Sequence, residues 1–183
     1  MKKTFLFFYV TILFCCGFTF SAEEKLQNLA LNKKYTSSEF HQGNMYGNCS
    51  DEGDAIQLTD GFTTIKDDSE PFFWFRKSTV GWIAKPWIET QIDLEKVSCV
   101  KQIAYHTSAG IHGFFWPKNI YILASKDGQN YKLVSDMIKD NEGKLPGYAP
   151  VGIYKPLNYR IESRKFNIQA RYIKLVINQL AYI

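Results

Sequence analysis

The chain of 183 residues lacks the short motifs by which several large classes of enzyme are recognised. It has no G-x-S-x-G nucleophile elbow, no glycine-rich phosphate loop, and no C-x-x-C or H-E-x-x-H spacing typical of a metal site. Its acidic pairs, such as Asp67 and Asp68, are typical of solvated loops, whereas a glycosidase needs two carboxyl groups about 5–10 Å apart across a cleft. We therefore do not expect an enzyme.

The chain also lacks a strong charge of either sign. Lys and Arg number 22 against 18 Asp and Glu, a formal net charge of +4. Binding to DNA or RNA normally needs a clustered basic face, so nucleic acid is not an expected partner. Helical periodicity is scarce, and no internal repeat, low-complexity tract or linker is present.

The N-terminal residues 1–21 are predicted to be a signal peptide ahead of one domain, residues 22–183. Lys2 and Lys3 form a basic start, an apolar run follows, and Thr19-Phe20-Ser21-Ala22 offers small residues for cleavage. The apolar run is short for a membrane span of about 20 residues, although an uncleaved anchor is the alternative. We expect a secreted, periplasmic or cell-surface protein with no transmembrane span after cleavage.

Two of the four cysteines, Cys49 and Cys99, remain after this cleavage. Export places them where thiols tend to oxidise. A disulfide requires their Cα atoms to lie about 4.4–6.8 Å apart, which the sequence does not establish. A single Cys49–Cys99 bridge and two separately buried thiols therefore both remain open.

What the chain does have is a series of short alternating segments, which predict an all-β, antiparallel β-sandwich. Ile103 and Tyr105 share one face of a strand by the period of two, as do Ile120 and Ile122 in a later strand. Asp127-Gly128 is typical of a tight hairpin turn. We expect strands at 34–38, 54–58, 87–93, 100–107, 118–125, 130–135, 158–163 and 171–178. The predicted buried residues are Trp87, Ile92, Leu94, Ile103, Tyr105, Ile120, Ile122, Leu133, Ile173 and Leu175.

Five segments resemble, in order, motifs of the coagulation factor V/VIII type C (discoidin) domain family. They are N-L-A-L-N-K-K-Y-T-S-S (28–38), L-T-D-G (58–61), W-I-E-T-Q-I-D-L (87–94), P-K-N-I-Y-I-L-A-S-K-D-G (117–128) and A-R-Y-I-K-L (170–175). The resemblance covers about residues 28 to 177. It implies a galactose-binding-like jelly roll, the fold shared with family 32 carbohydrate-binding modules.

The same resemblance raises a question about the closing strand. Discoidin-like domains add one more strand after the A-R-Y-x-x-L motif, whereas this chain stops at Ile183. Residues 178–183 could supply a minimal closing strand. We favour the alternative, that the closing strand is lacking because the chain is a truncated product of a longer gene with further domains.

Aromatic and polar residues gather together in the long connections 39–53, 61–86 and 108–117. A sugar has an apolar ring face and a rim of hydroxyls, so its site needs an exposed aromatic ring beside fixed donors and acceptors. Alternate connections of a jelly roll meet at the same end, where family 32 modules bind their ligands. The candidate ligand-binding residues are His41, Trp74, Arg76, Trp82, His112 and Phe115.

These residues predict an exported, non-catalytic module that binds a glycan or glycoconjugate. The alternative is a structural or adhesive domain of a larger secreted or cell-surface protein, in which residues such as Trp74 and Trp82 would lie in the core.

The resemblance also implies a structural calcium ion beside Asp60. Related modules hold the ion there with an Asp, a Thr and main-chain carbonyls, oxygen ligands that suit a hard cation. This chain departs from the pattern, because Phe62 replaces a frequent Asp and the late acidic ligand has no counterpart. We expect no other cofactor.

Overall fold

The computed structural model describes residues 26–37, 52–62, 79–82, 87–110, 115–147 and 157–179. These ranges contain mostly strands and turns, with a short 3-10 helix η1 (Glu52–Ala55) and a short α-helix α1 (Met137–Asp140). The predicted all-β, antiparallel class is confirmed. The strands are β1 (Tyr35–Ser37), β2 (Trp87–Val100), β3 (Ala104–Ala109), β4 (Asn119–Ser125), β5 (Lys132–Asp136), β6 (Leu157–Glu162) and β7 (Ile168–Asn178).

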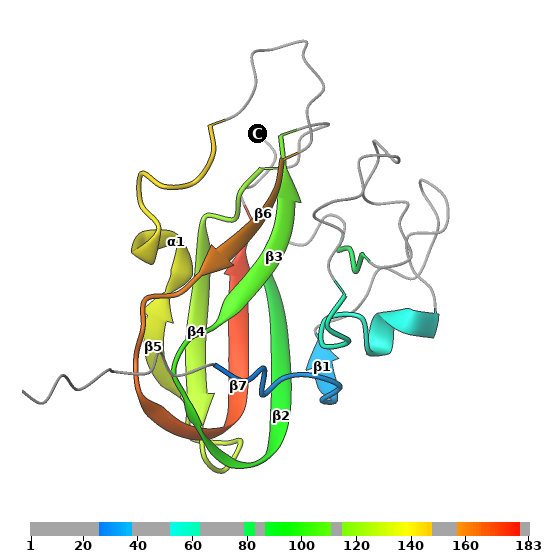
Figure 1. The fold of residues 1–183 in the computed structure, drawn as a ribbon, viewed down its shortest axis with the longest axis vertical. Coiled ribbons are helices and arrows are strands. Elements are labelled where there is room, and N and C mark those ends of the chain that lie inside the picture. The colour runs from blue at the N-terminus through cyan, green and yellow to red at the C-terminus, as the bar shows by residue number, and fades with distance from the viewer. Residues whose placement is uncertain are drawn as a thin grey trace, which may run out of the picture.

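The strands form two sheets that pack as a sandwich. The larger has the order β1-β2-β7-β4-β5, the smaller consists of β3 and β6, and every pair is antiparallel. Figure 1 shows β3 and β6 crossing in front of the larger sheet. Ile161 of β6 belongs to the same buried cluster as Ile88, Ile120 and Ile177 of the larger sheet, so the sheets share one core.

Alternation along the strands builds that core. Ile173, Leu175 and Ile177 of β7 are buried, and the residues between them are more exposed. Burying such a side chain contributes about 1.5–3 kcal/mol relative to leaving it in water. The predicted core is confirmed at Leu94, Ile120, Ile122, Ile173 and Leu175, which are buried. Ile92, Ile103 and Tyr105 are partly buried against the same cluster.

Two predicted core residues are wrong. Trp87 is 51% exposed and Leu133 is 65% exposed. Successive side chains of a strand face opposite sides of the sheet. Because Ile88 is fully buried, Trp87 lies on the outer face. Leu133 lies in the edge strand β5, beyond a shift in the β4–β5 register. Its side chain is therefore exposed to solvent and does not pack in the core.

The strand predicted at 54–58 is also wrong. The chain there forms η1 and successive turns, in which Ile56 N donates to Gly53 O at 2.8 Å and Thr59 N donates to Ile56 O at 3.0 Å. Five residues were too few to separate a strand from a turn by periodicity. The structure also has α1 where the sequence predicted a connection; Asp136 caps it by accepting from Ile138 N at 3.1 Å.

Strand polarity places the long connections together. Ser37 pairs with Thr90, Trp87 and Asn119 both pair with Asn178, and Ala109 pairs with Leu157. In Figure 1, β2 and β4 begin near the end of the sandwich at which β3 and β7 finish. We call this the long-connection end, because residues 38–86, 110–118 and 137–156 all leave and re-enter the strands there. The opposite end has the short connections 101–103, 126–131 and 163–167.

Candidate functional site

Four of the six predicted ligand-binding residues lie outside the described residues: His41, Trp74, Arg76 and His112. Their connections start and finish at the long-connection end, and their roles stay predictions. Trp82 and Phe115 lie within the described ranges, and the structure places them in different environments.

Phe115 is an exposed aromatic residue next to a buried one. It is 48% exposed, whereas Trp116 is 7% exposed. The Trp116 indole Nε1 donates to Pro146 O at 2.9 Å, and its ring meets Tyr159 of β6 edge-on with ring centroids 6.0 Å apart. These contacts fix the chain just before β4. Phe115 is thereby held at the surface of the long-connection end.

Trp82 has a different environment. It is partly buried and packs against the core cluster. A ring in that position contributes apolar burial to the fold, so its use as a stacking surface for a sugar stays a prediction.

His106 of β3 lies in a polar row on the outer face of the smaller sheet. Its Nε2 is 3.4 Å from Nη1 of Arg160 on β6, and Arg160 Nε donates to Glu162 Oε1 at 2.7 Å. Burial, together with the Arg160 charge, lowers the pKa of His106. The neutral imidazole is therefore favoured at neutral pH, and the row is held together by contacts among its own members.

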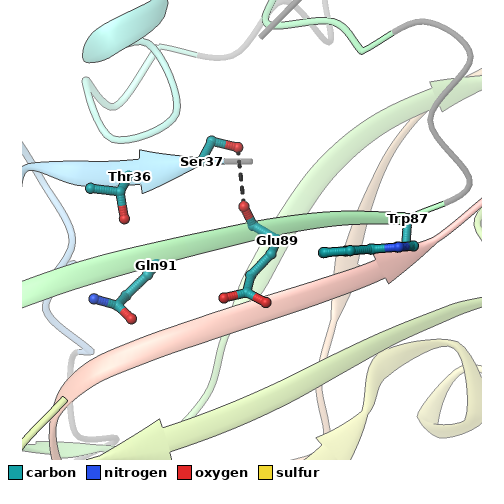
Figure 2. Close-up of a pocket in the computed structure, with 5 residues that line it drawn as sticks. All are labelled: Thr36, Ser37, Trp87, Glu89 and Gln91. Atoms are coloured by element: carbon teal, nitrogen blue, oxygen red, sulfur yellow. Dashed lines mark hydrogen bonds between the residues drawn. The ribbon is translucent and has the colours of Figure 1, made fainter. Parts of the chain in front are cut away.

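A pocket of about 320 Å³ opens on the outer face of the larger sheet, beside the long-connection end. It is lined by Thr36, Ser37, Trp87, Glu89 and Gln91. Figure 2 shows Trp87, Glu89 and Gln91 in line along β2, with Thr36 and Ser37 on the neighbouring strand β1. We call it the Trp87 pocket.

The alternation of β2 places these side chains together. Ile88 and Thr90 are buried, so the residues between and beside them face outward. Ser37 fixes β1 against β2, because its Oγ donates to Glu89 O at 3.2 Å and lies 3.1 Å from Thr90 Oγ1. The pocket therefore has an aromatic ring at one end and polar side chains along its length.

Ion pairs and hydrogen bonds hold the polar side chains of the Trp87 pocket in place. Lys174 Nζ lies 2.5 Å from Glu89 Oε1 and 4.5 Å from the centre of the Tyr131 ring. Tyr131 OH donates to Gln91 Oε1 at 2.5 Å. Burial, reinforced by the Glu89 charge, raises the pKa of Tyr131, which keeps its hydroxyl protonated as a donor. Glu89 is thus oriented by Lys174 of β7, and Gln91 by Tyr131 of the β4–β5 connection.

Sequence reasoning missed this pocket because it assigned Trp87 to the core. The signal was present in the segment W-I-E-T-Q-I-D-L, residues 87–94. One alternating set is mostly apolar, and the other has a tryptophan followed by three polar residues. A polar set headed by a single aromatic residue indicates an outer face with that ring on it.

The Asp60 loop does not by itself complete a calcium site. Asp60 Oδ1 accepts from Phe62 N at 2.8 Å, and Thr59 Oγ1 donates to Lys33 O at 2.7 Å. Asp60 and Asp54 lie near the Tyr35 hydroxyl, whose pKa is raised to about 12, chiefly by burial. Calcium takes six to eight oxygen ligands. The described residues include no cluster of three or more acidic, His or Cys side chains that could hold a metal. Asp60 as a calcium ligand stays a prediction.

The predicted Cys49–Cys99 bridge involves a residue outside the described ranges, Cys49. Cys99 is an exposed free thiol in this structure, and its Sγ lies 2.8 Å from Asn167 Oδ1. The alternative of a buried thiol therefore does not hold for Cys99, and the bridge itself stays untested.

No protein-family model and no curated protein matches the chain. Among solved structures, it is similar to chitosan-binding module 1 of a chitosanase/glucanase from Paenibacillus sp. IK-5, at 14% identity and a TM-score of 0.45, covering 84% of this chain and 88% of that one. It is also similar to module 2 of that enzyme, solved with chitotriose, at 14% identity and a TM-score of 0.43, covering 84% and 89%.

A third similar structure is CpGH89CBM32-6 from Clostridium perfringens, at 17% identity and a TM-score of 0.45, covering 84% of this chain and 90% of that one. The similar structures thus include a family 32 carbohydrate-binding module, from the group that shares the fold implied by the discoidin-like motifs. At these identities and TM-scores, the similarity assigns no ligand to this chain.

Proposed function

We propose that this chain is an exported, non-catalytic carbohydrate-binding module that docks a glycan at the long-connection end. The observation that carries the proposal is the common origin of the connections that hold the six candidate residues. They leave the strands at one end of the sandwich, where Phe115 is exposed and Trp116 anchors it.

The residue types in these connections match the chemistry of a sugar. An exposed ring such as Phe115 can cover the apolar face of a pyranose, while Arg76, His41 and His112 can exchange hydrogen bonds with its hydroxyls. The low net charge favours a neutral ligand over a polyanion. The lack of nucleophile and metal motifs supports binding without catalysis.

The direct test is a glycan array probed with the mature chain, residues 22–183, followed by titration of a glycan that the array selects. Phe115→Ala should weaken binding at least tenfold, which is about 1.4 kcal/mol, since a stacked ring contributes roughly 1–3 kcal/mol by analogy with base stacking. The melting temperature should change little, because the ring is half exposed.

Trp116→Ala is the matched control at the adjacent position. It empties a buried site and should lower stability by about 3–5 kcal/mol. Arrays without a bound glycan, or unchanged affinity in both Phe115→Ala and Trp74→Ala, would contradict the proposal.

A structural or adhesive domain is the second candidate, and the packing of Trp82 against the core favours it. Under this alternative the aromatic residues of the long connections serve the fold. Trp74→Ala and Trp82→Ala would then both unfold the domain, and no glycan would bind. Retained folding of Trp74→Ala with lost glycan binding would decide for the carbohydrate-binding module.

Export rests on the predicted signal peptide, residues 1–21, which lies outside the described residues. Within the described ranges, η1 and α1 are each four residues long, and no helix there could cross a bilayer. N-terminal sequencing of the secreted protein should begin at Ala22, and retention of Met1 in the membrane fraction would contradict cleavage.

A further inference from the structure

We propose that the Trp87 pocket is a second sugar-binding site, separate from the one at the long-connection end. Its ligand is one neutral sugar unit of an oligosaccharide. Its described lining residues belong to β1 and β2, on the face of the larger sheet.

The half-exposed indole of Trp87 is the first reason. Its neighbour Ile88 is fully buried, so the ring is not needed to complete the core. In Figure 2 the ring is seen edge-on and extends along β2 toward Glu89. An aromatic face next to polar groups is the surface that a sugar ring needs, because its own C–H face is apolar and its rim is polar.

The polar lining is the second reason. Glu89 supplies carboxylate oxygens and Gln91 an amide, and Thr36 adds an exposed hydroxyl. The amide Nε2 of Gln91 has no hydrogen-bond partner in the part of the chain that the structure describes, while its Oε1 is held by Tyr131. Sugar hydroxyls both donate and accept, so they can satisfy this mixture.

The fixed geometry of the lining is the third reason. Lys174 holds Glu89 and Tyr131 holds Gln91 before any ligand arrives. Binding therefore loses little side-chain conformational entropy at these two residues, which favours affinity for a small ligand. The Lys174 ammonium also balances the Glu89 charge, which favours a neutral sugar over a cation.

The size and shape of the pocket suit one sugar unit. Its volume of about 320 Å³ lies at the lower end of the range for small-ligand sites, about 300–1,000 Å³. The lining is mainly polar apart from one ring, whereas a groove for an amphipathic helix would need a row of apolar anchors.

The Phe115 side of the first site and the Trp87 pocket lie on different sides of the sandwich. Trp116, next to Phe115, packs on Tyr159 of β6, which belongs to the smaller sheet. The Trp87 pocket opens on the face of the larger sheet that is turned away from β3 and β6, because the alternate residues of β2 pack toward them. A substitution at one site should therefore leave the other intact.

The test follows the indole N–H signals of the ¹⁵N-labelled mature chain during separate titrations with lactose, maltotriose and cellotriose, which are all neutral. The Trp87 signal is identified by its loss in Trp87→Phe. We expect it to shift and saturate with at least one of these sugars. Trp87→Ala should weaken that binding at least tenfold, while Trp87→Phe, which keeps a ring, should retain most of it.

Two variants serve as controls, and a third tests the polar lining. Phe115→Ala should leave the affinity measured at Trp87 within about twofold, because that residue belongs to the other site. Leu133→Ala removes an exposed apolar side chain on β5 of the same sheet and should also have no effect. Glu89→Gln keeps the shape of the pocket and should weaken binding by removing the carboxylate.

Several outcomes would overturn the second site. If no sugar shifts the Trp87 signal while Phe115→Ala abolishes glycan binding, the proposed function stands and this inference fails. Equal weakening by Phe115→Ala and Trp87→Ala, at one sugar per chain, would mean a single site. A shift produced only by an alternating Thr-Val hexapeptide would assign the pocket to an extended peptide beside the edge strand β1.

Discussion

Three tryptophans of the described residues occupy three different environments, and immediate neighbours decide which. Trp116 is buried between Pro146 and Tyr159, Trp82 is partly buried on the core, and Trp87 stands on the outer face of β2. Hydrophobicity alone assigns all three to the interior. Two features distinguish a structural ring from one that can contact a ligand. They are whether its position in the strand faces inward or outward, and whether its indole N–H is hydrogen-bonded within the fold.

At the same scale, Asp93 and Arg171 form a two-pronged ion pair with distances of 2.8 and 2.9 Å. The Arg171 guanidinium lowers the pKa of Asp93 below its usual value of 3.8. The ionised form is therefore favoured in the folded state. The resulting stabilisation is present above about pH 4 and is lost as the pH falls through the lowered pKa of the folded state.

We predict that Asp93→Asn lowers the melting temperature at pH 7 and that the difference from the unmodified chain shrinks as the pH falls below about 4. Scanning calorimetry between pH 7 and pH 2 measures this. Glu142→Gln, at an exposed position, is the control and should follow the unmodified chain. A constant difference across the whole pH range would mean that the ion pair is not its cause.

At the scale of the elements, glycine conformation fixes the β4–β5 connection. Gly128 has φ of +77°, and a Cβ there would lie 3.2 Å from Cε2 of Tyr172 on β7. The Asp127 side chain accepts from the backbone N–H groups of Gln129 and Asn130, both within 3.0 Å. The expected Asp127-Gly128 turn therefore exists, within a connection longer than a tight two-residue hairpin.

We predict that Gly128→Ala costs about 1–2 kcal/mol from its left-handed backbone, with an added cost from the Tyr172 contact. Gly143→Ala is the matched control, since φ is +74° there and no atom lies within 4 Å of an added Cβ. Urea unfolding of both variants should place Gly128→Ala below Gly143→Ala in stability. Equal stabilities would show that the Tyr172 ring moves aside without cost.

Long alternating elements were predictable and short ones were not. β4 and β7 span seven and eleven residues, each has buried residues at alternate positions over part of its length, and both strands were expected. The segment 54–58 has too few residues for the period to separate strand from turn, and α1 is a single turn held by its Asp136 cap. At the site, residue types predicted an aromatic binding surface. The outward row of β2 was missed because its direction depends on which face β3 and β6 cover.

At the scale of the whole molecule, the common end of the long connections follows from antiparallel pairing and was predictable. The proposed calcium ion belongs to this scale, because its remaining ligands would have to join Asp60 from other parts of the chain. Asp60 Oδ1 already accepts from Phe62 N, and the other acceptor sites of this carboxylate could be used by an ion.

The calcium prediction is that a chelator lowers the melting temperature of the mature chain and that added calcium restores it, because an ion bound only by the folded state stabilises that state. Asp60→Asn should reduce this difference. The measurement is a thermal melt with EDTA, followed by excess Ca²⁺, with Mg²⁺ as the control cation. Identical melting curves under all conditions would contradict the prediction that a calcium ion stabilises this fold.

The position of β7 has a consequence for how the chain is made. β7 lies between β2 and β4, although both precede it in the sequence. Synthesis proceeds from the N-terminus, so the edges of β2 and β4 that pair with β7 stay unpaired until residues 168–178 have been synthesised. Exposed strand edges invite pairing with other chains. A strand that is synthesised after both of its neighbours thus joins the two halves of the larger sheet, so ribosome stalling upstream of β7 would leave an aggregation-prone intermediate.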